Sequence, residues 1–251
     1  MTTAAHDRRT TRGRGSGLCL AGRDLAAGLP ATLAVALITR RFFDLSASYL
    51  LHAVSMYMLL AGLILWRLPG CLPGPGLGAA NRVTLGRAAL VLPLAALALQ
   101  PAILGTAGAW WIIAVSTVAM ILDSVDGWIA RRTGTTPFGA RFDMELDAFL
   151  ILALSVLVWQ SGQAGVWVLL IGALRYLFVA AGWVWPALTA ELPPSRRRQT
   201  VCVAQGVVLL LCLTPVVPSV MASVVAVVAL GLLSASFVVD VRWLARRAAR
   251  R

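Results

Sequence analysis

Residues 123–147 read DSVDGWIARRTGTTPFGARFDMELD and carry half of the acidic side chains in a chain that has ten. These are Asp123, Asp126, Asp143, Glu145 and Asp147. Apolar runs at 107–122 and 147–160 enclose the segment. Carboxylates in or beside a membrane are costly, because they must be desolvated and they repel one another. Such a cluster therefore calls for a chemical reason.

The spacing of four of these carboxylates suits one shared site. Asp123 and Asp126 are three residues apart, and Asp143 and Asp147 are four apart, so each pair shares a helix face. Glu145 falls on a different face and is left out. Hard oxygen ligands favour Mg²⁺, Mn²⁺ or Ca²⁺, and four carboxylates can hold two ions. Alternatively, these carboxylates are interfacial charges, helix caps or partners for nearby arginines. A role at a helix N-terminus is reasonable for Asp143 alone, but it does not explain all four aspartates.

Two helices must position these side chains. The run at 107–122 is too short to cross a bilayer alone, so its helix is expected to continue through the first aspartate pair to about Arg131. The next helix is expected to begin near Gly139. The connection RTGTTPF is short, which predicts an antiparallel hairpin in which the two carboxylate pairs converge. Gly127 and Gly139 lie on the carboxylate faces, where a missing side chain gives a ligand access to the backbone.

Composition indicates an all-α integral membrane protein. The chain is 59% hydrophobic and 13% charged, with a mean hydropathy of +0.84, whereas soluble domains have about 25% charged residues. The formal charge is +12, and arginine supplies all 22 basic residues. This excess is typical of membrane topology and of contact with anionic lipid headgroups, and it does not indicate a nucleic-acid partner.

The apolar runs predict a six-transmembrane-helix catalytic bundle preceded by one or two accessory apolar helices. The first run, 25–39, is short and could be re-entrant or interfacial. The predicted segments are a basic cytoplasmic tail at 1–24, accessory helices at 25–68, a Pro/Gly linker at 69–79, the catalytic domain at 80–245 and a basic tail at 246–251.

The distribution of arginine predicts the orientation. The loops at 160–165 and 214–219 are uncharged, whereas most arginines fall at the opposite helix ends. We therefore expect a multi-pass protein of the cell membrane, with both chain ends and the acidic site on the cytoplasmic side. Arg40 and Arg41 are exceptions, because two added spans would place them outside.

The acidic segment resembles the signature of the CDP-alcohol phosphatidyltransferase family, D-x-x-D-G-x-x-A-R followed by G-x-x-x-D-x-x-x-D. The matching positions are Asp123, Asp126, Gly127, Ala130, Arg131, Gly139, Asp143 and Asp147. Upstream, ANRVTLGR resembles the N-x-x-T-x-x-R entry to this domain, at Asn81, Thr84 and Arg87. The resemblance covers roughly residues 80–245.

The resemblance implies a membrane enzyme of phospholipid biosynthesis that transfers the phosphatidyl group of CDP-diacylglycerol to an alcohol and releases CMP. It implies two Mg²⁺ or Mn²⁺ ions held by all four aspartates, with Asp147 also acting as the general base. The residues it places at the nucleotide are Gly127, Ala130 and Gly139 beside cytidine, Arg131 on the diphosphate, and Asn81, Thr84 and Arg87 nearby. A homodimer is left open.

The acceptor alcohol is less defined. Arg175 lies within an apolar run, and Arg196, Arg197 and Arg198 begin a later helix. Together they favour a phosphorylated acceptor such as inositol phosphate or glycerol phosphate. Alternatively the triplet is a membrane anchor, and serine, a second lipid or another alcohol is the acceptor.

Two other functional classes fit an acidic membrane cluster. Aspartate-rich membrane prenyltransferases bind a diphosphate through Mg²⁺, but their two aspartate motifs lie on distant helices. A cation channel or transporter could use the carboxylates as an ion site without any nucleotide. Release of CMP from CDP-diacylglycerol separates the three classes.

Overall fold

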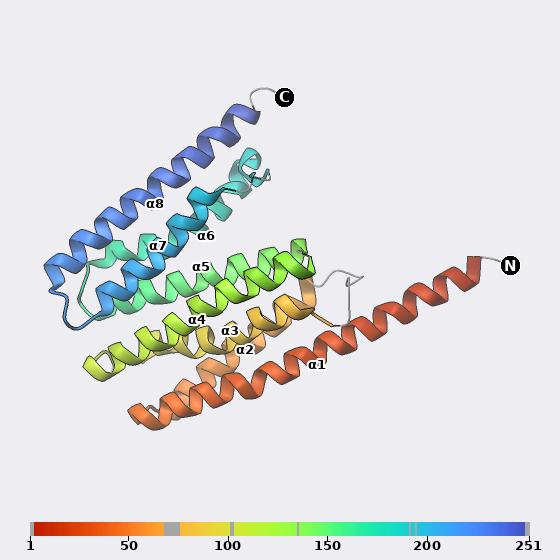
Figure 1. Ribbon diagram of the computed structural model, residues 1–251, viewed down its shortest axis with the longest axis horizontal. Helices are drawn as coiled ribbons and strands as arrows, with labels where there is room; N and C mark the ends of the chain where they lie inside the picture. Colours follow the sequence, from red (N-terminus) through yellow and green to blue (C-terminus); the bar gives the residue numbers. More distant parts are fainter. Residues whose placement is uncertain are drawn as a thin grey trace. The chain divides into compact units, whose positions relative to one another are not determined.

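A computed structural model describes residues 3–67, 76–100, 103–134, 136–190, 192–193 and 195–248, with side chains from residue 20 onward (Figure 1). These residues form helices and no strand, as the sequence predicts. The α-helices are α1 (Thr3–Phe43), α2 (Ala47–Arg67), α3 (Ala79–Ala96), α4 (Thr106–Thr133), α5 (Pro137–Gln160), α6 (Leu169–Val184), α7 (Arg196–Leu213) and α8 (Ser219–Ala248). Short 3-10 helices are η1 (Leu97–Leu99), η3 (Val166–Val168) and η4 (Pro186–Thr189).

Six helices in the described part of the chain are long and apolar enough to cross a membrane. They are Leu20–Phe43, Ala47–Arg67, Ala79–Leu99, Thr106–Thr133, Val166–Val184 and Ser219–Ala248. Helices α5 and α7 fall outside this set because three acidic residues lie in the first half of α5 and three arginines begin α7. Helices α3 to α8 are the six expected after the linker, and the two charged ones carry predicted site residues.

The accessory region consists of two helices. Helix α1 runs unbroken through the short apolar run 25–39, and its candidate span of 24 residues begins at Leu20. The segment expected as a polar tail is helical from Thr3. Most of the predicted linker, residues 68–75, lies outside the described residues, and α3 begins at Ala79.

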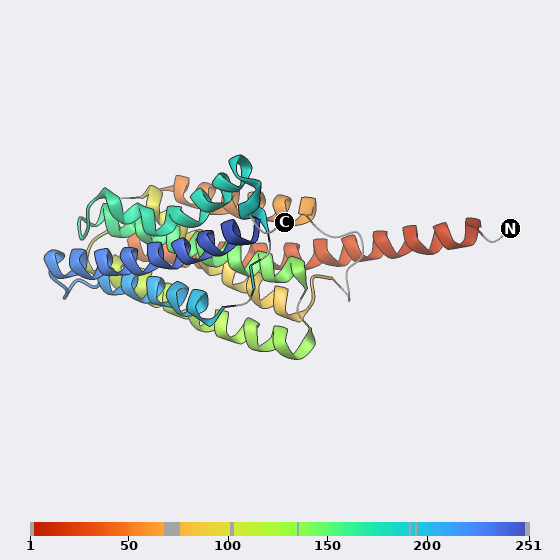
Figure 2. The ribbon, with the colours of Figure 1, turned by 90° about the horizontal axis from the view of Figure 1, so that it is seen from above.

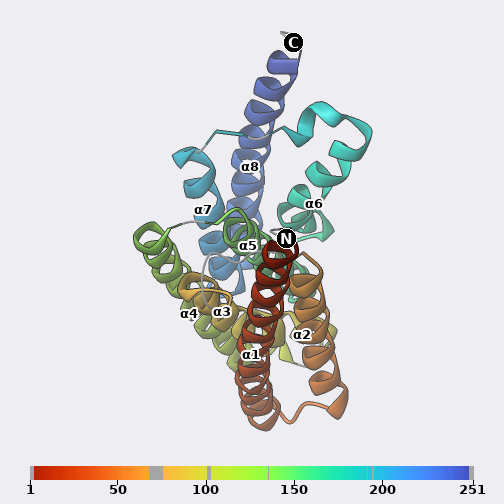
Figure 3. The same ribbon diagram turned by 90° about the vertical axis from the view of Figure 1, so that its right-hand side faces the viewer.

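The chain divides into two compact units, the first comprising residues 1–100 and 114–146 and the second comprising 101–113 and 147–251. In the first unit, α1, α2 and α3 pack against one another (Figures 1 and 3). Helix α3 is the most buried of the candidate spans, because apolar and small side chains cover almost its whole circumference. Three polar residues of α3, Asn81, Thr84 and Arg87, are buried inside the unit, whereas Arg82 is exposed.

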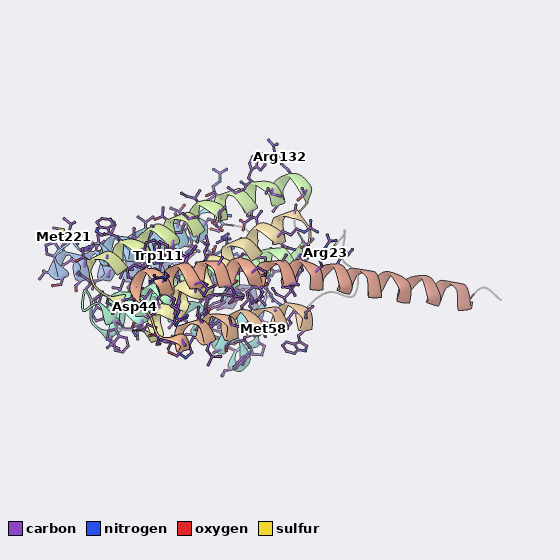
Figure 4. The ribbon with its side chains drawn as sticks, turned by 90° about the horizontal axis from the view of Figure 1, so that it is seen from below. Arg23, Asp44, Met58, Trp111, Arg132 and Met221 are labelled. Atoms are coloured by element: carbon purple, nitrogen blue, oxygen red, sulfur yellow. The ribbon has the colours of Figure 1, made fainter. Side chains whose placement is uncertain are left out.

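Both ends of the first unit carry charged residues. Figure 4 shows Arg23 and Arg132 toward one end of its helices and Asp44 toward the other. Arg40, near Asp44, donates from Nε to the carbonyl of Leu45 at 3.1 Å. Arg40, one of the two arginines that did not fit the predicted orientation, thus closes the turn between α1 and α2. This structural role gives a reason for a positive charge at that end of α1.

In the second unit, α7 and α8 lie side by side (Figure 2). The amide of Gln205 donates to the carbonyl of Ala229 at 2.9 Å, which joins the two helices in their buried middle. Helix α6 approaches α5 closely at Gly172, where a Cβ would collide with the Cα of Leu152. A glycine at this position therefore permits the two backbones to meet.

Candidate active site

The α4–α5 connection is built by local capping. Gly134, with φ +97°, follows α4 in the left-handed region and donates its N–H to the carbonyl of Ala130 at 3.0 Å. Thr136 then accepts the N–H of Gly139 at its hydroxyl oxygen, also at 3.0 Å, and Pro137 occupies the first helical position. Helix α5 consequently starts two residues before Gly139. The predicted continuation of α4 through Asp123 and Asp126 to about Arg131 is confirmed, since the helix ends at Thr133.

Arg87 of α3 lies among three of the predicted metal ligands. Its Nη1 is 2.9 Å from Asp123 Oδ1, 2.9 Å from Asp126 Oδ2 and 2.5 Å from Asp143 Oδ1. The side chain is 1% exposed, and its Nε donates to the carbonyl of Ala119 at 3.2 Å. A buried guanidinium is stable when carboxylates compensate it, and the carboxylates in turn repel one another less. Arg87 thus neutralises part of the acidic cluster.

Asp126 is the most buried of the aspartates. Its side chain is 3% exposed, and its Oδ2 accepts from Arg87 and, at 3.0 Å, from the hydroxyl of Thr84. The other oxygen, Oδ1, is buried without a hydrogen-bond partner in the structure. A buried carboxylate oxygen left in this way is costly. A bound cation would satisfy it.

Asp147 lies one helical turn beyond Asp143 on α5. It is the first residue of α5 that belongs to the second unit. One carboxylate oxygen from each of Asp123, Asp143 and Asp147 lies within 4.8 Å of the other two. All three side chains are partly exposed. Carboxylate oxygens at such separations can share a hard cation, so the residues present fit the divalent ions that the sequence predicts.

The predicted nucleotide residues lie around this cluster in two pairs. Asn81 contacts Gly139, because a Cβ on the glycine would lie 2.5 Å from Asn81 Oδ1. Arg131 lies over Gly127, where a Cβ would be 3.4 Å from the arginine Nη1. The missing side chain of Gly139 thus makes room for Asn81. The missing side chain of Gly127 makes room for Arg131 over the face of α4 that carries the aspartates.

The predicted acceptor residues belong to the second unit. Arg175 is half-buried in α6, and Arg196 is exposed at the start of α7. Arg197 donates from Nη1 to the carbonyl and the hydroxyl of Ser236, at 2.6 Å each, and its Nη2 forms an ion pair with Asp240. Arg198 Nη1 is 3.5 Å from Asp240. Two of the three arginines are thus engaged with α8.

Sequence reasoning missed the partners of these arginines. Asp240 is an acidic residue within the apolar run of α8, and such a residue normally signals a buried counter-charge, so that signal was available. The three-residue spacing of Asn81, Thr84 and Arg87 also places them near one helix face. That the face meets the carboxylates depends on how α3 packs, which no local pattern contains.

Comparison with known families matches residues 77–239 to CDP-alcohol phosphatidyltransferase. This segment includes α3, the whole acidic hairpin and most of the helices that follow. Comparison with curated proteins and with solved structures found no match. The matched segment is more than half of the chain and contains the aspartate cluster described above, so the chain belongs to the CDP-alcohol phosphatidyltransferase family.

Proposed function

We propose that the protein transfers the phosphatidyl group of CDP-diacylglycerol to an alcohol acceptor, with release of CMP. Family membership supports a transferase that acts on a CDP-alcohol in a membrane. The observation that carries the finer proposal is the convergence of Asp123, Asp143 and Asp147 within 4.8 Å. A diphosphate donor brings negative charge that bare carboxylates would repel, so cations between them are required.

Asp123, Asp126, Asp143 and Asp147 would hold two Mg²⁺ or Mn²⁺ ions. When bound, these ions supply Lewis-acid polarisation of the diphosphate oxygens and neutralise charge on the departing CMP. The buried Asp126 Oδ1 and the three clustered oxygens support this ligand set. Arg87, buried beside Asp123, Asp126 and Asp143, would fix the orientation of these carboxylates.

In the reaction, Asp147 would accept the proton of the acceptor hydroxyl. The hydroxyl oxygen forms a bond to the phosphorus that carries diacylglycerol, and the bond from that phosphorus to the oxygen of CMP breaks. Arg131, at the exposed end of α4, would pair with the diphosphate. Gly127, Ala130 and Gly139 would border the cytidine, with Asn81 and Thr84 close by.

For the acceptor, we propose an alcohol that carries a phosphate, such as inositol phosphate or glycerol phosphate. Arg175 and Arg196 offer charge for this phosphate, since arginine binds phosphate through paired hydrogen bonds. Arg197 and Arg198 would contribute if phosphate displaced them from Asp240.

Enzyme purified in detergent with added lipid would be supplied with CDP-diacylglycerol and a panel of alcohols, and CMP release would be measured. We expect release to require both an alcohol and a divalent cation, to cease in EDTA and to return with Mg²⁺ or Mn²⁺. CMP release that persists in chelator would refute the metal mechanism. Consumption of no CDP-diacylglycerol with any alcohol would refute the proposed donor.

A further inference from the structure

A carboxylate on an accessory helix contacts the start of the catalytic domain. Asp24 of α1 accepts the backbone N–H of Leu77 at Oδ2, at 2.9 Å, and its Oδ1 is 3.1 Å from Nε of Arg82. The Asp24 side chain is 9% exposed. Gly76, with φ +71°, passes so close that a Cβ there would collide with Asp24 Oδ2. Both oxygens of Asp24 are thus committed to the segment that leads into α3.

Helix α3 has little capping of its own. Its N-cap is Gly78, which provides no side-chain hydrogen bond, and its first turn contains no acidic residue. The first amides of a helix need acceptors and favour a nearby negative charge. Asp24, more than 50 residues away in sequence, places a carboxylate beside this helix start. It accepts the N–H of Leu77, just before the N-cap, and pairs with Arg82 in the first turn.

Contacts continue from this capped segment to the candidate site. Asn81 donates from Nδ2 to the carbonyl of Leu77 at 2.7 Å, and its Oδ1 lies against Gly139 of α5. Leu77 is therefore held at its N–H by Asp24 and at its carbonyl by Asn81. The position of Asn81, and with it the contact of its Oδ1 with Gly139, depends on the same backbone segment that Asp24 holds.

Asp24 is itself held in place. The adjacent residue, Leu25, accepts the hydroxyl of Tyr57 from α2 at its carbonyl, at 2.5 Å. At Gly28, one turn later, a Cβ would collide with the Tyr57 hydroxyl and lie 3.2 Å from Leu85 of α3. The three helices thus meet tightly at this level, so α1 presents the carboxylate from a fixed position.

We infer that Asp24 is a positioning residue of the enzyme: it fixes the start of α3 and, through Leu77 and Asn81, sets the nucleotide side of the site. The accessory helices are then a working part of the catalytic unit. The kinetic consequence rests on the proposed function, because donor binding is the step that Asn81 and Gly139 would serve.

The test uses the full-length enzyme with Asp24→Ala and Asp24→Asn. Alanine removes both acceptors, whereas asparagine keeps an oxygen for the Leu77 N–H. We expect Asp24→Ala to raise the KM for CDP-diacylglycerol about tenfold, as when a hydrogen bond to a charged group that fixes a site is lost. The acceptor KM and kcat should stay within about twofold of the parent. Asp24→Asn should fall in between.

A second measurement is independent of activity. Hydrogen–deuterium exchange of a peptide covering residues 76–84 should be faster in Asp24→Ala than in the parent. Asp44→Asn is the matched control, because Asp44 is an exposed aspartate just after the C-terminal end of α1 (Figure 4). Its φ of +51° is one that asparagine tolerates. This control should change neither measurement.

Each outcome decides the inference. Faster exchange with an unchanged donor KM would reduce Asp24 to a structural cap and overturn the positioning role. If neither the exchange nor the donor KM changes, Asp24 neither fixes the start of α3 nor positions the site. If Asp24→Ala does not fold, Asp24→Asn supplies the comparison. If the parent does not use CDP-diacylglycerol, the proposed function fails, and the exchange comparison still decides whether Asp24 fixes the start of α3.

Discussion

At the scale of single residues, Arg87 holds the acidic cluster together. One guanidinium lies within 2.9 Å of three carboxylates and is 1% exposed. Removing one member of a buried ionic group leaves uncompensated charge behind, which costs more than the interaction itself contributes. In this case the charge left behind would be the carboxylate of Asp126, which is 3% exposed. Arg87 therefore stabilises the fold as well as the site.

We expect Arg87→Gln to lower the free energy of unfolding by about 3–5 kcal/mol, the usual cost of breaking a buried ion pair. Thermal unfolding in detergent would measure the change. Arg41→Gln, at an exposed position on α1, is the control and should stay within about 0.5 kcal/mol of the parent. Mn²⁺ should stabilise Arg87→Gln at least as strongly as the parent, because the carboxylates remain. A variant as stable as the parent would contradict the role given to Arg87.

Asp147 tests the chemistry at the same scale. Asp147→Asn keeps the shape of the side chain but cannot accept the hydroxyl proton. We expect kcat to fall about 100-fold or more, as for loss of a positioned general base. Binding of CDP-diacylglycerol should remain measurable, because the other three aspartates are unchanged. Turnover close to that of the parent would remove Asp147 from the mechanism.

At the scale of elements, the acidic hairpin of α4 and α5 could be predicted from the sequence, whereas the packing of α3 against it could not. Turn and capping residues between Thr133 and Gly139, together with the aspartate spacing, fix where α4 ends and α5 begins. The position of α3 depends instead on contacts with residues of the accessory helices, such as Asp24 and Tyr49. Tyr49, for example, donates to the carbonyl of Pro93 at 3.1 Å. Contacts between residues so distant in sequence leave no local signal.

The α7–α8 pair gives the element-scale prediction. Arg197 makes two hydrogen bonds to Ser236 and an ion pair with Asp240, whose side chain is 11% exposed. We expect Arg197→Gln to destabilise the enzyme by about 1.5–3 kcal/mol, typical for hydrogen bonds to charged groups. Arg196→Gln should leave stability unchanged and raise the KM of a phosphorylated acceptor. Thermal unfolding and acceptor kinetics of both variants separate the two roles.

The opposite pattern would assign the roles the other way. If Arg197→Gln leaves stability unchanged while Arg196→Gln lowers it, Arg197 is the better candidate for the acceptor phosphate. If neither variant alters acceptor kinetics, and an unphosphorylated alcohol is used well, the triplet is a membrane anchor.

At the scale of the whole molecule, charge and helix count set the topology. Helices α1 and α2 are both long and apolar enough to cross a membrane. If both cross, the chain returns to its starting side before α3 begins. The number of spans was less predictable from sequence. The run 25–39 is too short by itself, and α1 lengthens it at both ends only because the flanking residues continue the helix.

The last prediction concerns this topology and the side on which the site opens. With the four native cysteines replaced by serine, single cysteines would be introduced as Asp44→Cys, Val216→Cys and Arg132→Cys. Val216 lies in a loop predicted to face outward, and Asp44 lies in a connection that faces outward if α1 crosses the membrane. Arg132 lies in the last turn of α4, next to the α4–α5 connection. An impermeant maleimide on intact cells should label Asp44→Cys and Val216→Cys, and should reach Arg132→Cys only after permeabilisation. Each variant must retain CMP release, so that a native fold is being labelled.

Labelling of Asp44→Cys only after permeabilisation would mean that α1 does not cross the membrane. Labelling of Arg132→Cys on intact cells would place the aspartates on the outer side and reverse the proposed orientation.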